Sequence, residues 1–176
     1  MTTNVLEPRS TQPSIPTLVA FIMAVLTATG CTNVKEEVII PAPPGAIWKV
    51  LIDAKGYPAW NTLLTPTEGS LQQGAYMTYR YTPPNDEPID LRFKVETSDR
   101  GRTLRQTGGT WGLFSFDHQW SLEAIPEGTR VTQSEAFAGI MVLFWDSEWL
   151  PTTYRTINSA LKKEVIRRQQ PANTAP

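Results

Sequence analysis

Two neighbouring stretches in which apolar and polar residues alternate constrain this chain more than any other feature. They run from Phe114 to Ala124 and from Thr129 to Ala138, and the turn Pro126-Glu127-Gly128 separates them. Side chains of a strand alternate between the two faces of a sheet, so each stretch predicts a strand with one apolar face. A short turn between two such strands predicts an antiparallel hairpin.

Polar side chains lie on the apolar face of this predicted hairpin. His118 of the first strand shares that face with aromatic residues, as do Gln133 and Glu135 of the second strand. A short loop sets a register that pairs Trp120 with Glu135 and His118 with Phe137. An unpaired polar group in a solid core costs roughly 1–3 kcal/mol, so the pattern predicts a core that is partly a pocket.

Turn residues and alternation predict further strands before the hairpin. They lie at Lys35–Pro41, Met77–Tyr81, Leu91–Glu96 and Thr103–Thr107, and a flexible connection follows at Gly108–Gly112. Helical spacing predicts a helix that starts after the prolines at 41–44 and ends near Gly56. Tyr57–Asn61 predicts a second short helix or a tight loop. Consecutive strands without intervening helices indicate an antiparallel meander.

A long helix is predicted near the C-terminus, from about Pro151 to Arg168, after the apolar segment Gly139–Trp149. Its apolar stripe consists of Tyr154, Ile157, Leu161 and Val165. We therefore expect an α+β fold. It combines an antiparallel sheet of about six or seven strands, two short helices after the first strand, and the long C-terminal helix.

Composition narrows the possible partners. The chain of 176 residues has room for one domain with a terminal extension, and its net charge of -1 comes without a basic face, so we expect no nucleic acid partner. The single cysteine, Cys31, excludes an intramolecular disulfide. With only one histidine as well, the chain has few ligands for a metal ion. Gly108-Gly109 lacks the spacing and the lysine of a phosphate loop, and the sequence has no Gly-x-Ser-x-Gly elbow. We expect neither a metal nor a cofactor.

Residues 1–31 are expected to form a signal or membrane-anchor segment. The uncharged apolar run Leu18–Leu26 is too short for a span of about 20 residues but suits a signal peptide. Small residues then lead to Cys31, which resembles the lipobox of bacterial lipoproteins, in which the cysteine is lipidated. The resemblance implies a lipoprotein of the cell envelope that faces the periplasm, and Thr32 favours the outer membrane. The alternatives are a simple membrane anchor, or a cytoplasmic protein with a buried cysteine if this segment is not a signal.

Four further runs carry a family resemblance: PPGAIWKVL at 43–51, YPAWN at 57–61, DHQWSL at 117–122 and TRVTQSEAFAG at 129–139. They resemble the START/Bet v 1-like (SRPBCC) superfamily, and within it the bacterial polyketide cyclase/dehydrase-like branch. The resemblance covers about residues 34–168. It implies a helix-grip domain at 32–168, followed by a disordered tail at 169–176. In such a domain the curved sheet wraps around the C-terminal helix and leaves a cavity between them.

The side chains expected to line this cavity are mostly aromatic or aliphatic, with His118 and Glu135 as the ionisable members. They are Trp60, Met77, Tyr79, Phe93, Phe116, His118, Trp120, Glu135, Phe137, Tyr154, Ile157 and Leu161.

Three functional hypotheses follow from this cavity. The first is binding of a hydrophobic or aromatic small molecule, lipid-like or polyketide-like, which His118, Glu135 and Tyr79 orient. The second is a cyclase or dehydratase-type enzyme, in which His118 is the general base and Glu135 orients it. The third is a protein-interaction module that docks a partner through the apolar segment Ile140–Trp149.

Overall fold

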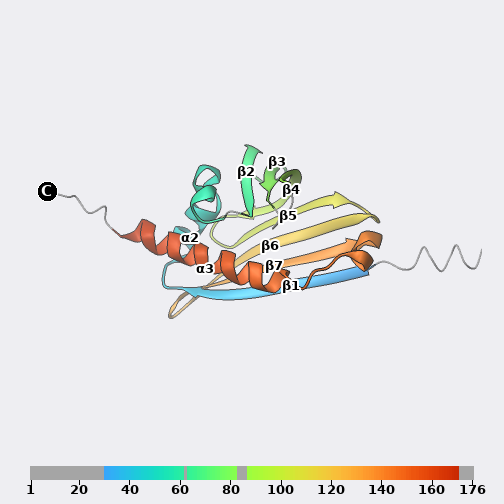
Figure 1. Cartoon of the computed structure of the whole chain (residues 1–176). Helices are drawn as coiled ribbons and strands as arrows, with labels where there is room; N and C mark the ends of the chain where they lie inside the picture. Colours follow the sequence, from blue (N-terminus) through green and yellow to red (C-terminus); the bar gives the residue numbers. More distant parts are fainter. Residues whose placement is uncertain (1–29, 62, 83–86, 171–176) are drawn as a thin grey trace, which may run out of the picture.

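The computed structural model describes residues 30–61, 63–82 and 87–170. Within them the chain forms seven strands, two α-helices and two short 3-10 helices (Figure 1). In chain order these are β1 (Gly30–Ile40), α2 (Pro44–Leu51), η1 (Ala54–Ala59), β2 (Leu64–Gly69), β3 (Tyr76–Tyr81), β4 (Ile89–Asp99), β5 (Thr103–Thr110), β6 (Phe114–Ile125), β7 (Gly128–Gly139), η2 (Ile140–Phe144) and α3 (Leu150–Gln169).

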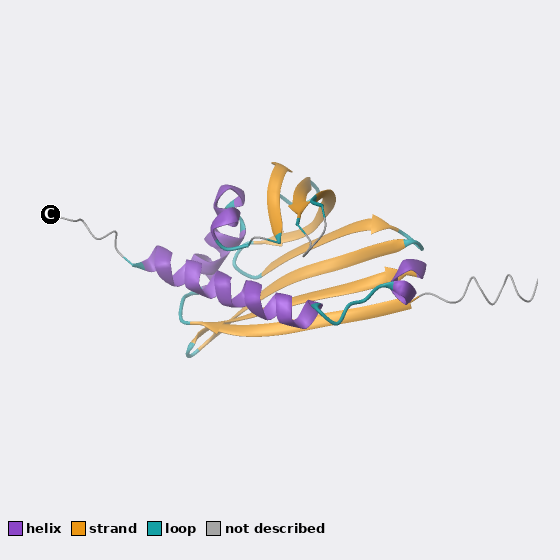
Figure 2. Ribbon diagram, in the orientation of Figure 1, coloured by secondary structure: helices purple, strands orange, loops and turns teal. Residues whose placement is uncertain are grey.

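The seven strands form one antiparallel sheet in the order β1-β7-β6-β5-β4-β3-β2. Figure 2 shows this sheet curving around the long helix α3, which runs along its concave side. The short helices α2 and η1 carry the chain from the edge strand β1 to the opposite edge strand β2. The expected α+β class and helix-grip arrangement are confirmed.

The loop between β6 and β7 consists of Pro126-Glu127, because Ile125 pairs with Gly128. Proline suits a turn position, since its ring fixes φ and it has no backbone N–H for the ladder. Gly128 has a φ of +131°, which a residue with a side chain rarely adopts. The turn therefore closes one residue earlier than predicted.

This earlier turn changes the register of the hairpin but preserves its faces. His118 lies opposite Glu135, and Trp120 lies opposite Gln133. The predicted pairs, Trp120 with Glu135 and His118 with Phe137, are wrong by two residues. A shift of two residues leaves each side chain on the same face of the sheet, so the predicted inner face still holds.

Strands β1, β4 and β5 are longer than predicted, and β4 spans Ile89–Asp99 instead of Leu91–Glu96. β1 begins at Gly30, which pairs with Gly139, so Cys31 is part of the strand and its side chain is exposed. β5 continues through Gly108 and Gly109, which pair with β6 instead of forming a flexible connection. These extensions depend on hydrogen bonds to a neighbouring strand, and the apolar pattern of each segment does not reveal them.

The helices differ from the prediction mainly after the first strand. α2 ends at Leu51 and not near Gly56, because η1 follows it; the Asp53 carboxylate accepts a hydrogen bond of 3.2 Å from the Gly56 amide. The long helix α3 includes Pro151 in its first turn, where a missing N–H costs nothing. Its buried side contains the predicted stripe and also Asn158 and Glu164.

Candidate ligand-binding site

The side chains predicted to line a cavity gather between the concave face of the sheet and α3. Eleven of the twelve are buried, and Glu135 is partly exposed. Six aromatic rings form a chain of contacts with successive centroids 4.4 to 6.4 Å apart; in order they are Trp120, Trp60, Tyr57, Tyr79, Phe93 and Phe116. These rings make an apolar wall around the polar residues of the interior.

A row of polar side chains crosses this wall on three adjacent strands. Gln106 of β5 lies opposite His118 of β6, which lies opposite Glu135 of β7. The Gln106 amide Nε2 donates to the hydroxyl of Tyr79 over 3.0 Å, and burial raises the pKa of Tyr79 to about 12. The Tyr79 hydroxyl, predicted to orient a ligand, is therefore engaged by Gln106.

His118 is held by a diagonal neighbour on β7. Its Nε2 lies 3.1 Å from Nε2 of Gln133, and the ring packs edge-on against Trp120 with centroids 5.6 Å apart. Because the amide nitrogen donates, the ring accepts at Nε2 and carries its proton on Nδ1. Burial lowers the pKa of His118 to about 4, against the opposite effect of the Asp117 charge. The imidazole is therefore neutral at pH 7.

Glu135 has a separate partner on the helix. The Tyr154 hydroxyl donates to Oε2 of Glu135. Burial, and secondly the negative charge of Asp117, raise the pKa of Glu135 to about 8. At pH 7 the side chain is mostly a neutral carboxylic acid. The hypothesis of an imidazole oriented and made more basic by Glu135 finds no support in these contacts, since Gln133 holds His118 and burial makes the ring less basic.

Several buried polar atoms of the interior have no hydrogen-bond partner among the described residues. They number five and belong to four side chains: Trp60 Nε1, His118 Nδ1, Gln133 Oε1, and Nδ2 and Oδ1 of Asn158. Each of these residues is at most 5% exposed. Asn158 follows Tyr154 by one helical turn and so shares its inward stripe. Unpaired buried polar atoms are rare in folded proteins, so each of these atoms is a position where another molecule can supply a hydrogen bond.

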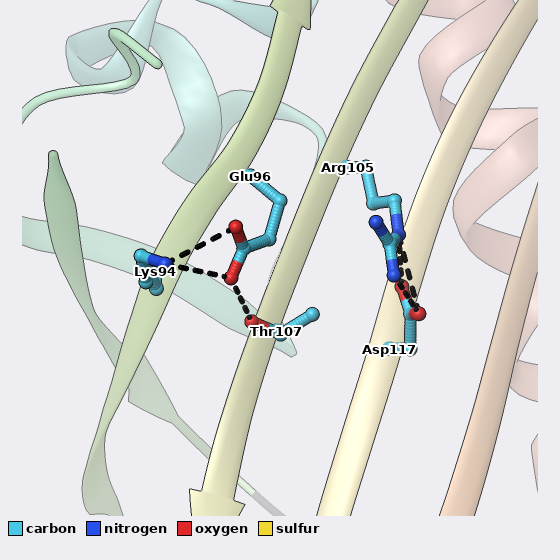
Figure 3. A network of polar contacts seen from close by, with 5 residues as sticks. All are labelled: Lys94, Glu96, Arg105, Thr107 and Asp117. Carbon is cyan, nitrogen blue, oxygen red and sulfur yellow. Dashed lines mark hydrogen bonds and ion pairs between the residues drawn. The ribbon is translucent and has the colours of Figure 1, made fainter. Parts of the chain in front are cut away.

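The outer face of the same strands differs from the inner one. Figure 3 shows Lys94 bonded to Glu96, whose carboxylate also accepts from Thr107, and Arg105 forming a two-pronged pair with Asp117. The Arg105 nitrogens lie 2.9 and 2.6 Å from the two Asp117 oxygens. These polar groups on the outer face thus pair with one another, whereas several of those facing the interior keep an atom without a partner among the described residues.

Two grooves lie outside this interior. One of about 650 Å³ crosses the outer face over small residues of β5, β6 and β7. Another of about 370 Å³ follows the solvent side of α3 between Thr152 and Lys163. Neither is lined by a residue with an unpaired buried atom.

Sequence reasoning missed two polar residues of the interior, Gln106 and Asn158. A signal for each was present. Gln106 comes two residues after the buried Leu104 in β5 and so lies on the same face, and Asn158 falls between Tyr154 and Leu161 on the predicted stripe of α3. Unlike the hairpin, β5 and α3 were predicted from their apolar residues alone, so neither polar residue was assigned to an inner face.

The described part of the chain bears on two other expectations. Among its residues, no group of three or more His, Cys, Asp or Glu side chains is placed to hold a metal ion. No helix in residues 30–61, 63–82 and 87–170 is long and apolar enough to cross a membrane. The predicted apolar run Leu18–Leu26 lies outside the described residues, and so does the predicted tail from Pro171 onward. The tail was predicted to start at Gln169, but α3 continues through that residue.

Comparison with known proteins identifies one family and many solved structures with the same fold. A family model described as polyketide cyclase / dehydrase and lipid transport matches residues 32–165. No curated protein matches the sequence.

Solved structures of three proteins illustrate the shared fold. A Rhodobacter sphaeroides protein is 14% identical with a TM-score of 0.65, covering 80% of this chain and 99% of its own. A Thermus thermophilus protein is 14% identical with a TM-score of 0.63, covering 79% and 100%. Ara h 8.0201 is 18% identical with a TM-score of 0.60, covering 78% and 99%. These matches bear out the START/Bet v 1-like architecture, and at such identities they concern the fold alone.

Proposed function

The chain belongs to the polyketide cyclase / dehydrase and lipid transport family, and from this membership and its interior chemistry we propose that it binds a hydrophobic small molecule between the sheet and α3. The observation that carries the proposal is the group of five unpaired polar atoms on Trp60, His118, Gln133 and Asn158. Leaving each unpaired costs roughly 1–3 kcal/mol. A bound polar group that pairs with them recovers that cost, and the aromatic wall supplies apolar contact for the rest of the ligand.

The interior also restricts the charge of the ligand. His118 is neutral at pH 7 because its pKa is about 4, and Glu135 is mostly neutral because its pKa is about 8. An ionised group brought among these side chains would meet no opposite charge from either of them, and burying an unpaired charge is costly. We therefore expect a lipid-like or polyketide-like molecule whose inner end carries an uncharged hydroxyl, carbonyl or amide group.

Mass spectrometry tests this function directly. The full chain is purified from its native host without detergent, and native and denaturing spectra are compared. A bound mass that is lost on denaturation, from a molecule with an apolar body and an uncharged polar group, is the expected result. The proposal fails if the protein carries no such mass and also takes up neither a fatty alcohol nor an apolar fluorescent probe.

A pair of variants on β7 locates the binding. Gln133→Leu removes an unpaired acceptor and the partner of His118, so the retained mass should decrease strongly. Ser134→Ala changes the next residue, which faces the other side of the sheet, and should leave ligand retention unchanged. Equal retention in both variants would place the ligand elsewhere. A fatty alcohol should also bind more tightly than an alkyl sulfate of the same chain length.

Proton-transfer chemistry of the cyclase or dehydratase type is a second candidate. The specific observation in its favour is Glu135, whose pKa of about 8 is near the operating range of a general acid. Tyr154 fixes one oxygen of this carboxylic acid, so the other is free to donate its proton to a bound ligand. Once a ligand is identified, Glu135→Gln should abolish turnover and retain binding, and His118→Ala tests the role first assigned to the ring. Full turnover in Glu135→Gln would remove this candidate.

Attachment to the membrane completes the proposal. The apolar run Leu18–Leu26 and the exposed Cys31 at the start of β1 support an envelope lipoprotein that faces the periplasm. The mass of the N-terminal peptide from the native host decides between lipidation of Cys31, an uncleaved anchor and an unprocessed cytoplasmic chain.

A further inference from the structure

Six large apolar side chains are exposed together at one end of the sheet. They belong to the turn after β5 and to the segment around η2, and we name them the end patch: Trp111, Leu113, Ile140, Met141, Leu143 and Phe144. Trp111 is 94% exposed and Phe144 is 84% exposed. Isolated exposed apolar residues are ordinary, but a contiguous group of this kind marks an interaction surface.

Backbone contacts join the two segments of the end patch. The amide of Ile140 donates to the carbonyl of Gly112 over 3.1 Å, and the amide of Met141 donates to the carbonyl of Leu113 over 3.0 Å. Leu143 lies against Gly30, where an added Cβ would come within 3.0 Å of the Leu143 amide nitrogen. Figure 1 shows η2, the turn between β5 and β6 and the start of β1 at the same end of the sheet.

The chain that precedes the described residues constrains what can cover this patch. β1 starts at Gly30, and only residues 27–29 separate it from the apolar run Leu18–Leu26. An extended chain spans at most about 3.5 Å per residue, so four residues of chain reach at most about 14 Å from Gly30. If the apolar run enters a membrane, the end of the sheet that carries the patch is held against the membrane surface. A lipid on the adjacent Cys31 would impose the same orientation.

From these observations we propose that the end patch is a membrane-docking face that inserts into the surface of a lipid bilayer. Its most exposed members are a tryptophan and a phenylalanine, and tryptophan favours the membrane–water interface. The apolar run of nine residues is shorter than the roughly 20 needed to cross a bilayer, so a second apolar contact strengthens a weak anchor. No patch residue is charged, and Asp146 and Glu148 follow it, so docking depends on apolar contact and not on anionic lipid.

The test uses the full chain and phosphatidylcholine vesicles. An environment-sensitive fluorescent amino acid replaces Phe144 in one protein and Ile52 in a matched second protein. Ile52 is 41% exposed and lies between α2 and η1. Emission and quenching by aqueous iodide are recorded with and without vesicles. At position 144 we expect a blue shift and at least a threefold loss of quenching on adding vesicles, and at position 52 no change of either. Raising the salt concentration should not reverse the effect.

Every other outcome overturns the proposal. If both labels stay equally accessible to iodide while the protein floats with the vesicles, the apolar run anchors it and the patch does not dock. If position 144 is already shielded without vesicles at all protein concentrations, the chain's own N-terminal segment covers the patch. Shielding that grows with protein concentration means that a second copy covers it. These results do not depend on whether the interior binds a ligand, so docking and ligand binding can fail separately.

Discussion

Replacing Asn158 by leucine tests the interpretation of the interior as a binding site. Asn158 is 2% exposed, lies on the inward stripe of α3, and has neither its amide nitrogen nor its amide oxygen paired among the described residues. Leucine has nearly the same size and branches at the same carbon, so Asn158→Leu removes both polar atoms without opening a large cavity. We expect this variant to be more stable than the natural chain when no ligand is bound, and to bind the ligand more weakly.

The magnitude follows from the two unpaired atoms. Each costs roughly 1–3 kcal/mol, so their removal should raise the free energy of unfolding by about 2–4 kcal/mol, at the lower part of the summed range because water can meet part of the cost. A helix accepts leucine slightly better than asparagine, but that preference contributes only a few tenths of a kcal/mol. The polar contribution is therefore much larger than the helical one.

Urea unfolding of the ligand-free protein measures this effect, with Ser159→Leu as the matched control. Ser159 is the next residue of α3 and faces solvent, so its variant should change stability by no more than about 0.5 kcal/mol. Affinity for a fatty alcohol should fall at least tenfold in Asn158→Leu and stay unchanged in the control. If Asn158→Leu is destabilised by more than about 1 kcal/mol and binds normally, the amide is a structural element and the reasoning is refuted.

Three other changes test separate parts of the molecule. The pKa of Glu135 rises from 4.5 to about 8 on folding, so between these pH values the folded state keeps a proton that the unfolded chain loses. The free energy of unfolding should therefore fall as pH rises from 4.5 to about 8. In urea titrations, Glu135→Gln should make this fall smaller. Glu164, 5% exposed, has its pKa lowered to about 2 by Arg167 and then Arg168, so its stabilising effect is complete above pH 4.5 and is lost as pH falls towards 2. Glu164→Gln should cost about 1–3 kcal/mol at pH 7, and the difference should vanish near pH 2 in acid unfolding; a constant difference would contradict the ion-pair explanation. A Cβ at Gly109 would come within 2.2 Å of a β6 carbonyl oxygen, whereas Gly74 has a similar positive φ and open space around it. Gly109→Ala should therefore lower the melting temperature more than Gly74→Ala. Equal losses would show that the φ angle alone causes the destabilisation.

The architecture could be predicted because strand periodicity is a local property. His118, Gln133 and Glu135 were placed on the inner face by alternation, and that assignment survives the two-residue error in register. The register itself depends on which residues form the turn. The observed loop, Pro126-Glu127, lies one residue earlier than the loop that the predicted pairs require. Partners such as Gln133 for His118 could not be derived without the correct register.

Burial from several elements explains why the ionisation states were not predicted. A sequence shows that His118 and Glu135 share a face, but the helix and the aromatic rings decide how far each is removed from water. The result is the reverse of the expected relation: the imidazole has a pKa of about 4 and the carboxylic acid a pKa of about 8. Desolvation disfavours whichever form is charged, so it acts in opposite directions on the two groups.

The two faces of β5 and β6 provide an internal comparison of what polar residues do in this fold. On the outer face Arg105 and Asp117 pair directly, and neither leaves a buried atom without a partner. On the inner face of the same strands, Gln106 is paired through Tyr79, but His118 keeps an unpaired Nδ1 proton. A helix-grip core needs only apolar residues at these positions to hold α3, since apolar packing carries no desolvation cost. The inner polar groups therefore lower the stability of the empty protein, and the neutral polar ligand that we propose would reverse this loss by hydrogen-bonding to them.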